Sequence, residues 1–194
     1  MSKNSIQRVW WRFLRLLGME KLSWDKQFEA GIWCRGPRSP ETLKRVQELC
    51  RGGRLVEFGC GEGTLPFLLP PEAFSSYSGY DISQVAVERA KRRAIKAGAT
   101  NIQFEQCDMS RWNGTDNVSL ILAEECLYYL TACDTERFLV QCSKSLTREG
   151  SILVIVHSAS KHSETLSVCR HVCRVHDEAS VGGRAFLTLT PRAS

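Results

Sequence analysis

The stretch "RLVEFGCGEGTL", residues 54–65, places three glycines at alternate positions, Gly59, Gly61 and Gly63, directly after an apolar run. The apolar run predicts a buried strand over residues 54–58, and the glycines predict a turn that lets a ligand approach bare backbone. The third glycine comes one residue too early for the G-x-G-x-x-G turn of dinucleotide-binding proteins, and no Gly-Lys-Ser or Gly-Lys-Thr follows. The turn therefore predicts a ligand other than a dinucleotide or a nucleoside triphosphate.

Two acids sharpen this expectation. Glu57 precedes the glycines and Glu62 lies among them, so a pyrophosphate on the turn would meet like charge. An adenosine-like ligand that lacks phosphates and carries positive charge would be favoured. S-adenosylmethionine, with its sulfonium and ammonium groups, meets both demands, whereas a nicotinamide dehydrogenase is disfavoured.

The rest of the chain alternates between predicted strands and helices, which indicates a mostly parallel sheet with right-handed crossovers. Strands are predicted over residues 54–58, 77–80, 102–106, 118–123 and 152–156, and helices over 39–50, 64–69, 83–97 and 134–147. Gly98 is expected to end the helix over 83–97, and Gly150 follows the helix over 134–147. Residues 168–192 are compatible with a strand pair joined near Gly182, with its last strand over 185–189, or with a helix in their first half.

Carboxylates at strand ends extend the predicted ligand site. Asp81 ends the second strand, 18 residues after Gly63, where it can accept hydrogen bonds from both ribose hydroxyls. Asp108 follows the third strand, where it can accept from an adenine amino group.

At this point the chain resembles the class I S-adenosylmethionine-dependent methyltransferases over about residues 50–157. The motifs are "VEFGCGEG", "YDIS", "CDM", "AEECLYYL" and "REGSILVIV", in the family's order. Together with "WDKQFEAGIW", they are most similar to small-molecule methyltransferases such as the nodulation protein S-like N-methyltransferases. The resemblance implies a Rossmann-like α/β fold whose seven-stranded, mostly parallel sheet has an antiparallel last strand and helices on both faces. It implies one domain over 1–194, made of an N-terminal lid (1–38), a cofactor-binding core (39–157) and a C-terminal strand pair (158–194).

The resemblance also implies roles for individual residues. The cofactor, S-adenosylmethionine with S-adenosylhomocysteine as product, would contact Glu57, Gly59, Cys60, Gly61, Gly63, Asp81, Ile82, Asp108, Met109 and Glu124. Glu125, His157 and Tyr128 are the candidate catalytic residues, because all three lie at strand ends on the ligand side. For Glu57 the alternative is capping of a strand, for His157 simple solvation, and for Tyr128 packing. Trp112 is either a cover for adenine or a core residue, and Trp24 and Trp33 are expected to wall the acceptor site.

Composition restricts the partners, the compartment and the metal content that we expect. The 194 residues carry a formal net charge of +5 with dispersed basic residues, so no nucleic-acid partner is expected. Nine cysteines without a CxxC pair predict reduced thiols in the cytoplasm, and no run reaches the length of a membrane span. No metal is expected at Cys169, His171, Cys173 and His176, whose spacing is unlike that of zinc ligands. The basic, aromatic segment 8–17 suggests a lid or, alternatively, a membrane-surface helix.

The predicted function is methyl transfer to an amine or hydroxyl of a small molecule, with sugars and secondary metabolites among the candidates. The predicted assembly is a monomer or a homodimer. One alternative is an RNA methyltransferase, although "EECL" stands where base-amino methylation usually places Asn/Asp-Pro-Pro-Tyr/Phe. The other is a non-catalytic scaffold, and the intact Glu57, Asp81 and Asp108 argue against loss of cofactor binding.

Overall fold

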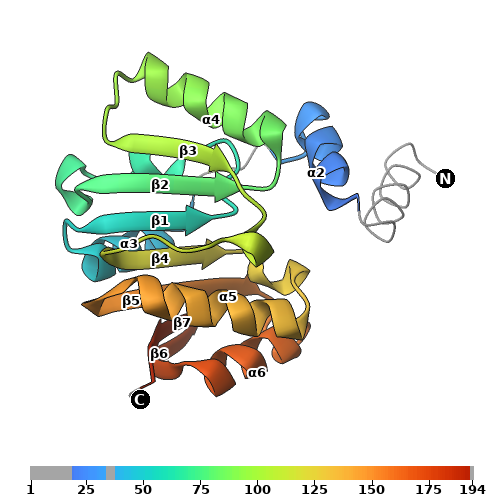
Figure 1. Cartoon of the computed structure of the whole chain (residues 1–194), viewed down its shortest axis with the longest axis vertical. Helices are drawn as coiled ribbons and strands as arrows, with labels where there is room; N and C mark the ends of the chain where they lie inside the picture. The colour runs from blue at the N-terminus through green and yellow to red at the C-terminus, as the bar shows by residue number, and fades with distance from the viewer. Residues whose placement is uncertain (1–18, 34–37, 193–194) are drawn as a thin grey trace.

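The computed structural model describes residues 19–33 and 38–192. Its centre is a seven-stranded sheet in the order β3-β2-β1-β4-β5-β7-β6 (Figure 1). The strands are β1 (Arg54–Phe58), β2 (Ser76–Asp81), β3 (Ile102–Gln106), β4 (Val118–Glu124), β5 (Leu146–His157), β6 (Arg174–Val181) and β7 (Arg184–Thr190). β1 to β5 pair in parallel, and β7 lies antiparallel between β5 and β6. This arrangement confirms the predicted fold class.

Helices cover both faces of the sheet (Figure 1). The α-helices are α2 (Glu20–Glu29), α3 (Pro40–Cys50), α4 (Gln84–Lys96), α5 (Ala132–Ser145) and α6 (Ser163–Val172). The described residues also form four short 3-10 helices: η1 (Leu65–Phe67), η2 (Pro71–Ala73), η3 (Met109–Arg111) and η4 (Leu127–Tyr129). The helix predicted over 64–69 is therefore only the single 3-10 turn η1.

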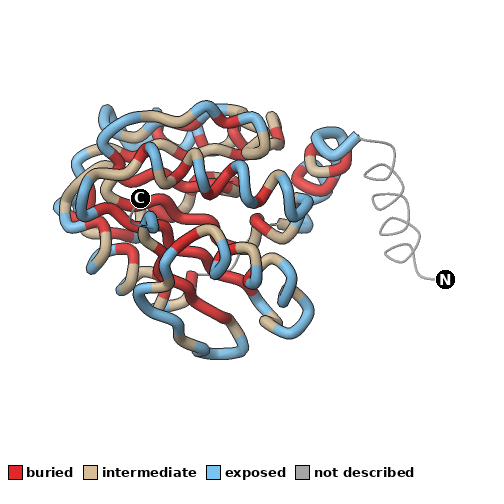
Figure 2. The backbone as a smooth tube through the Cα atoms, turned by 60° about the horizontal axis from the view of Figure 1, so that its bottom comes forward, coloured by how far each residue is buried: buried red, intermediate tan, exposed pale blue. Residues whose placement is uncertain are grey.

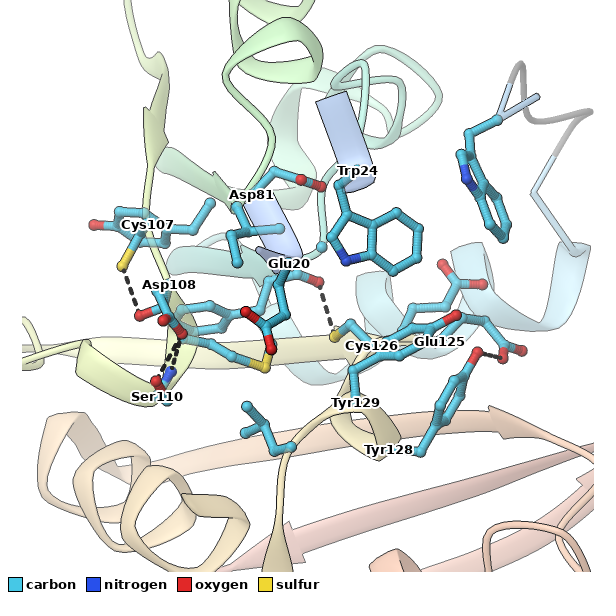
Figure 3. A pocket seen from close by; sticks show the side chains of 18 of the residues that line it. Glu20, Trp24, Asp81, Cys107, Asp108, Ser110, Glu125, Cys126, Tyr128 and Tyr129 are labelled. Atoms are coloured by element: carbon cyan, nitrogen blue, oxygen red, sulfur yellow. Dashed lines mark hydrogen bonds between the residues drawn. The ribbon is translucent and has the colours of Figure 1, made fainter. Parts of the chain in front are cut away.

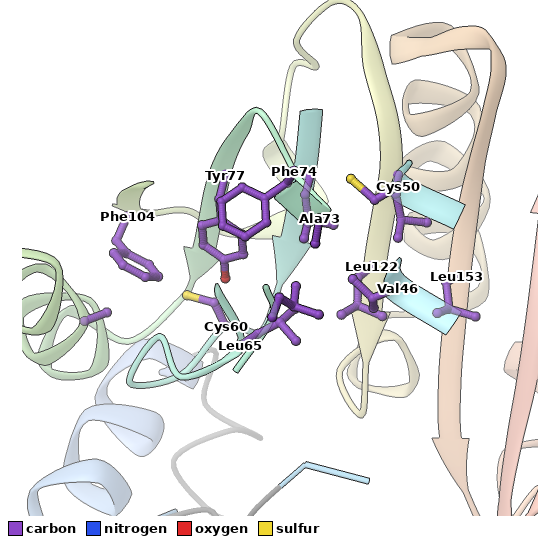
Figure 4. Packing of buried hydrophobic residues seen from close by; sticks show 14 of the residues in the cluster. Val46, Cys50, Cys60, Leu65, Ala73, Phe74, Tyr77, Phe104, Leu122 and Leu153 are labelled. Carbon is purple, nitrogen blue, oxygen red and sulfur yellow. The ribbon is translucent and has the colours of Figure 1, made fainter. Parts of the chain in front are cut away.

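Neighbouring residues of a strand point to opposite faces, so each central strand supplies both core layers. The layer under α3 and α4 includes Val46, Ala90, Leu55, Leu120 and Leu153. Figure 4 shows part of this layer, with Val46 and Leu153 labelled. The layer under α5 and α6 includes Val56, Ile121, Val154, Leu139 and Leu166. The tube in Figure 2 shows this as buried strands enclosed by helices with exposed outer faces.

The largest difference from the predicted bounds lies at the junction of α5 and β5. α5 begins at Ala132, because the Thr131 side chain accepts a hydrogen bond from the Asp134 amide, and it ends at Ser145. β5 then starts at once, without a glycine turn. Gly150 is a strand residue whose backbone lies against β4: an added Cβ would be 2.7 Å from the Val118 carbonyl oxygen. Because Gly150 has no Cβ, β5 can approach β4 closely at this point.

The C-terminal part combines both alternatives left open by the sequence. Residues 163–172 form α6, and β6 and β7 form the strand pair around Gly182. The helix predicted over 83–97 is α4, with the Ser83 hydroxyl accepting from the Ala86 amide and Gly98 at φ +65° after its end. The predicted lid, residues 1–38, lies mostly outside the described residues, and segment 8–17 lies entirely outside them.

Candidate active site

A cavity of about 840 Å³ opens at the carboxyl ends of β1, β2 and β4 (Figure 3). Its walls include residues from α2, from η4 and from the turns that follow β1 to β5. The predicted site residues that line it are Gly59, Asp81, Ile82, Asp108, Met109, Glu124, Glu125, Tyr128 and His157. The predicted residues that do not line it are Glu57, Cys60, Gly61 and Gly63. Trp24 and Trp33, expected at the acceptor site, are both on its wall.

The glycines of the turn serve different purposes. Gly59 lines the cavity in the left-handed region, at φ +68°. Gly61 donates its amide to Asp81 Oδ2 at 2.8 Å and so ties the turn to β2. At Gly63 an added Cβ would lie 2.4 Å from the Phe104 ring and 2.7 Å from Ala90. Gly63 therefore allows the turn to pack against the core.

Asp81 and Asp108 line the cavity and also shape its walls. Asp81 Oδ1 accepts from the Ser83 amide at 2.9 Å, which fixes the turn into α4. Asp108 Oδ1 accepts from the Ser110 amide at 2.9 Å and from the Ser110 hydroxyl at 2.7 Å. A carboxylate offers about four acceptor positions, so both side chains can still accept from a ligand. Trp112, by contrast, packs in the core against Phe58.

A buried cluster of ion pairs lies beneath the cavity. The guanidinium of Arg38 donates to Glu57 at 2.5 Å and to Glu124. Arg38 is 7% exposed, Glu57 0% and Glu124 3%. Burial alone would lower the pKa of Arg38, but the two carboxylates outweigh it and raise that pKa above its ordinary value. Arg38 therefore stays charged. Arg38 lines the cavity, and its Nε is buried without a hydrogen bond to a described residue.

Two further residues complete this cluster. The Tyr77 hydroxyl donates to Glu57, and burial followed by the charge of Glu57 raises the Tyr77 pKa well above its ordinary value. Arg184 on β7 donates to Glu124 at 3.2 Å. Sequence reasoning missed Arg38, because no motif surrounds it and its partners lie 19 and 86 residues away in the chain.

A second polar cluster stands at the ends of β4 and β5. Glu125 Oε2 lies 2.5 Å from His157 Nδ1, and it accepts from the His157 amide and the Tyr128 hydroxyl, each at 3.1 Å. The Tyr128 ring stacks on His162, with centroids 3.9 Å apart. Burial and the neighbouring His157 lower the pKa of His162. The three predicted catalytic residues are thus brought together, and His162 joins them.

Helix α2 is held over the cavity by contacts to α4. Asp25 Oδ1 accepts from the Ser83 hydroxyl at 2.7 Å and from the Val85 amide at 3.2 Å, so it adds a carboxylate to the amino end of α4. Burial alone would raise the pKa of Asp25, but Ser83, Lys21 and the Val85 amide lower it below the ordinary value. This docking places Trp24 in the cavity, with its indole against Tyr129 (Figure 3).

The described residues hold neither a metal-binding cluster nor a membrane-spanning helix. Within residues 19–33 and 38–192, no group of three or more His, Cys, Asp or Glu side chains is arranged to hold a metal ion. Cys169 and Cys173 are buried in the core. None of the helices in the described part of the chain has both the length and the apolar character needed to cross a membrane.

Comparison with known proteins identifies the class. The family model described as "Methyltransferase domain" matches residues 49–184, so the chain belongs to that family. This confirms the resemblance, with S-adenosylmethionine as the cofactor of the class. The oriented carboxylates of Asp81 and Asp108 are acceptors of the kind that its ribose hydroxyls and adenine amino group require.

Particular relatives add detail. A 2-heptyl-1-hydroxyquinolin-4(1H)-one methyltransferase of Mycobacteroides abscessus is 31% identical over 84 residues, which cover 43% of this chain and 37% of that protein. A methyltransferase structure from Clostridium acetobutylicum has a TM-score of 0.67 at 13% identity, over 79% of this chain and 89% of that one. The N-methyltransferase NodS of Bradyrhizobium japonicum, in complex with S-adenosylhomocysteine, has a TM-score of 0.65 at 14% identity, over 79% and 87%. The two solved structures establish the shared fold.

Proposed function

We propose that the protein transfers the methyl group of S-adenosylmethionine to a hydroxyl or amine of a small molecule, such as a sugar or a secondary metabolite. One observation carries the proposal: a single cavity joins the carboxylates of Asp81 and Asp108 to the Glu125–His157 pair. The first two suit a nucleoside, and the pair suits an acceptor that loses a proton. The names of the similar methyltransferases support a small acceptor.

On the cofactor side, S-adenosylmethionine supplies a methyl group on a positively charged sulfur. Asp81 accepts hydrogen bonds from the ribose hydroxyls, and Asp108 accepts from the adenine amino group, with Ile82 and Met109 alongside. Arg38, on the cavity wall, supplies positive charge beside the methionine carboxylate. These roles are assigned from the cavity lining and from the acceptor positions that the fold leaves on the two carboxylates.

The remaining acids act on the same amino-acid group. Glu124 accepts from the ammonium, since it lines the cavity. Glu57 supports that end of the site from beneath, because it holds Arg38 and is itself fully buried. With acceptor and methyl aligned in one enclosed space, the protein contributes orientation and exclusion of water.

On the acceptor side, Glu125 orients His157 through Nδ1, which leaves Nε2 to take a proton from the acceptor. Tyr128 fixes the same carboxylate by its hydroxyl. This arrangement supports a general base, which accelerates a proton-coupled transfer by about 10²–10⁴-fold. The cytoplasmic location and the monomeric or homodimeric state remain predictions.

Calorimetric titration of S-adenosylmethionine and S-adenosylhomocysteine tests the proposal. Both should bind the wild type and the Asp116→Asn control, since Asp116 is exposed and lies before β4, away from the cavity. Asp81→Asn should lose most of the affinity, with its unfolding midpoint measured in parallel because Asp81 also holds the glycine turn. Equal affinity of Asp81→Asn and wild type, or no binding by the wild type, would contradict it. Binding without transfer to small acceptors would favour the scaffold alternative, and transfer to RNA would favour the RNA methyltransferase.

A further inference from the structure

One wall of the cavity is built from aromatic rings that come from separate elements. Trp24 on α2 and Tyr129 in η4 meet edge to face, with centroids 5.0 Å apart and an interplanar angle of 82°. Trp33 lies 5.5 Å from Trp24, and Tyr128 lies 4.7 Å from Tyr129. All four rings line the cavity. Such rings offer broad apolar faces of fixed orientation, which recognise planar ring compounds by stacking and edge-to-face contact.

The position of this wall is set by buried contacts. The Trp33 indole donates to Gln27 Oε1 at 3.1 Å, and Gln27 is 5% exposed on the inner side of α2. Asp25 anchors the same helix to α4. The aromatic wall is therefore preorganised, which lowers the entropic cost of binding a rigid ring.

The Glu125–His157 pair also lines this cavity and is held under backbone strain. Glu125 has φ +58°, a left-handed conformation that costs free energy in a residue with a side chain. Its amide donates to the Ile155 carbonyl at 2.8 Å, which locks that conformation and aims the carboxylate at His157. Charged and titratable groups around the imidazole come from several elements: Glu125, Tyr128, His162 and Arg184.

A base of this kind distinguishes between acceptor classes. An amine attacks as the neutral base, so its proton can leave after the transfer. A hydroxyl becomes a strong nucleophile only as its proton leaves, so it gains most from a general base within hydrogen-bond reach. The Glu125–His157 pair therefore favours a hydroxyl, and the aromatic wall favours a planar ring that carries it.

We infer that the acceptor is a planar aromatic compound with a ring hydroxyl, which stacks against Trp24 and Tyr129 while His157 removes the hydroxyl proton. The inference rests on the proposed function and names its substrate class. A bond forms between the acceptor oxygen and the methyl carbon as the carbon–sulfur bond breaks. The electron pair of that bond stays on sulfur, giving S-adenosylhomocysteine, and the proton moves to His157 Nε2.

A matched acceptor panel tests this inference on the full chain. Hydroxyquinoline, aminoquinoline and glucosamine are offered with labelled S-adenosylmethionine, and binding of hydroxyquinoline to the S-adenosylhomocysteine-loaded protein is measured by calorimetry. Transfer to hydroxyquinoline should be the fastest. Trp24→Leu should weaken hydroxyquinoline binding by about tenfold or more and leave S-adenosylhomocysteine binding nearly unchanged. Leu22→Ala, on the exposed side of α2, is the control.

The base is tested separately. His157→Gln should lower kcat by about 10²-fold or more while acceptor and cofactor affinities change little. His176→Gln, at an exposed position of β6, should match the wild type. Faster transfer to aminoquinoline or glucosamine, or an unchanged kcat in His157→Gln, would overturn the inference. Transfer to none of the three by a protein that binds S-adenosylhomocysteine would overturn it too, yet leave the proposed function standing. Failure to bind S-adenosylhomocysteine would refute both.

Discussion

Replacing Arg38 by methionine should be the most destabilising single change in the cavity floor. The substitution keeps an unbranched chain but leaves Glu57 without its cation, and it leaves Glu124 with only Arg184. Glu57 is 0% exposed and Glu124 is 3% exposed, so water cannot replace the lost charge. Breaking a buried pair by removing one partner costs about 3–5 kcal/mol, a large part of a typical stability of about 5–15 kcal/mol.

Urea unfolding followed by circular dichroism measures this loss. Arg184→Met is the matched control, because Arg184 is the second cation that contacts Glu124, at 3.2 Å. The Arg184 side chain is 36% exposed. Because water screens this partly exposed guanidinium, the pair should contribute about 1 kcal/mol or less. Adding Glu57→Gln to Arg38→Met should restore part of the loss, since the uncompensated charge is removed. A cost for Arg38→Met no greater than that for Arg184→Met would refute the argument.

Two other predictions concern the turn and the buried thiols. Gly63→Ala should destabilise the fold by about 2–4 kcal/mol, because its Cβ would meet the Phe104 ring at 2.4 Å in a left-handed turn. Gly98→Ala, with open space around it, is the control and should cost only about 1 kcal/mol in the same denaturation assay. Equal costs would contradict the packing role of Gly63. Burial raises the pKa of Cys50 to about 11 and that of Cys169 to about 12, so the unfolded thiols ionise first as pH rises above 9.0. The contribution of each thiol to the free energy of unfolding should be complete below pH 9.0 and then fall by about 1.4 kcal/mol per pH unit. In urea titrations at pH 8 and pH 10, Cys169→Ala should lose less of this free energy between the two pH values than the wild type does. An unchanged slope would contradict the thiol's part in it.

Much of the fold could be predicted because its signals are local. Alternation of apolar runs and amphipathic segments placed β1 and β3 at their observed bounds, and Ser39 before Pro40 marked the start of α3. The prediction failed where tertiary packing replaces local chemistry. Gly150 followed a predicted helix, but the structure uses it to bring β5 against the Val118 carbonyl.

The same distinction between local sequence signals and tertiary packing separates the residues of the site. Asp81, Asp108 and Glu125 follow strands directly, and the carboxyl ends of parallel strands meet at one edge, so topology alone brought them to one cavity. Arg38 could not be found this way. Its partners are carboxylates on β1 and β4, 19 and 86 residues away, and sequence spacing carries no record of such distant contacts.

The sequence predicted a positively charged ligand from Glu57 and Glu62 in the glycine turn, but in the structure an arginine pairs with each of these acids. Glu62 pairs with Arg89 at 2.7 Å, and Glu57 pairs with Arg38, so neither acid presents an uncompensated charge to the cavity. The preference for a cationic ligand must instead come from acids on the wall. Glu20, Asp81, Asp108 and Asp134 line the cavity, and Arg38 and Arg184 are the arginines among its described lining residues. Asp108 and Asp134 also pair with Arg111 and Arg137, but these arginines are 87% and 63% exposed, so water screens their charge. Because the guanidiniums of Arg38 and Arg184 are engaged with Glu124, this excess of carboxylate is what a sulfonium would meet on entering.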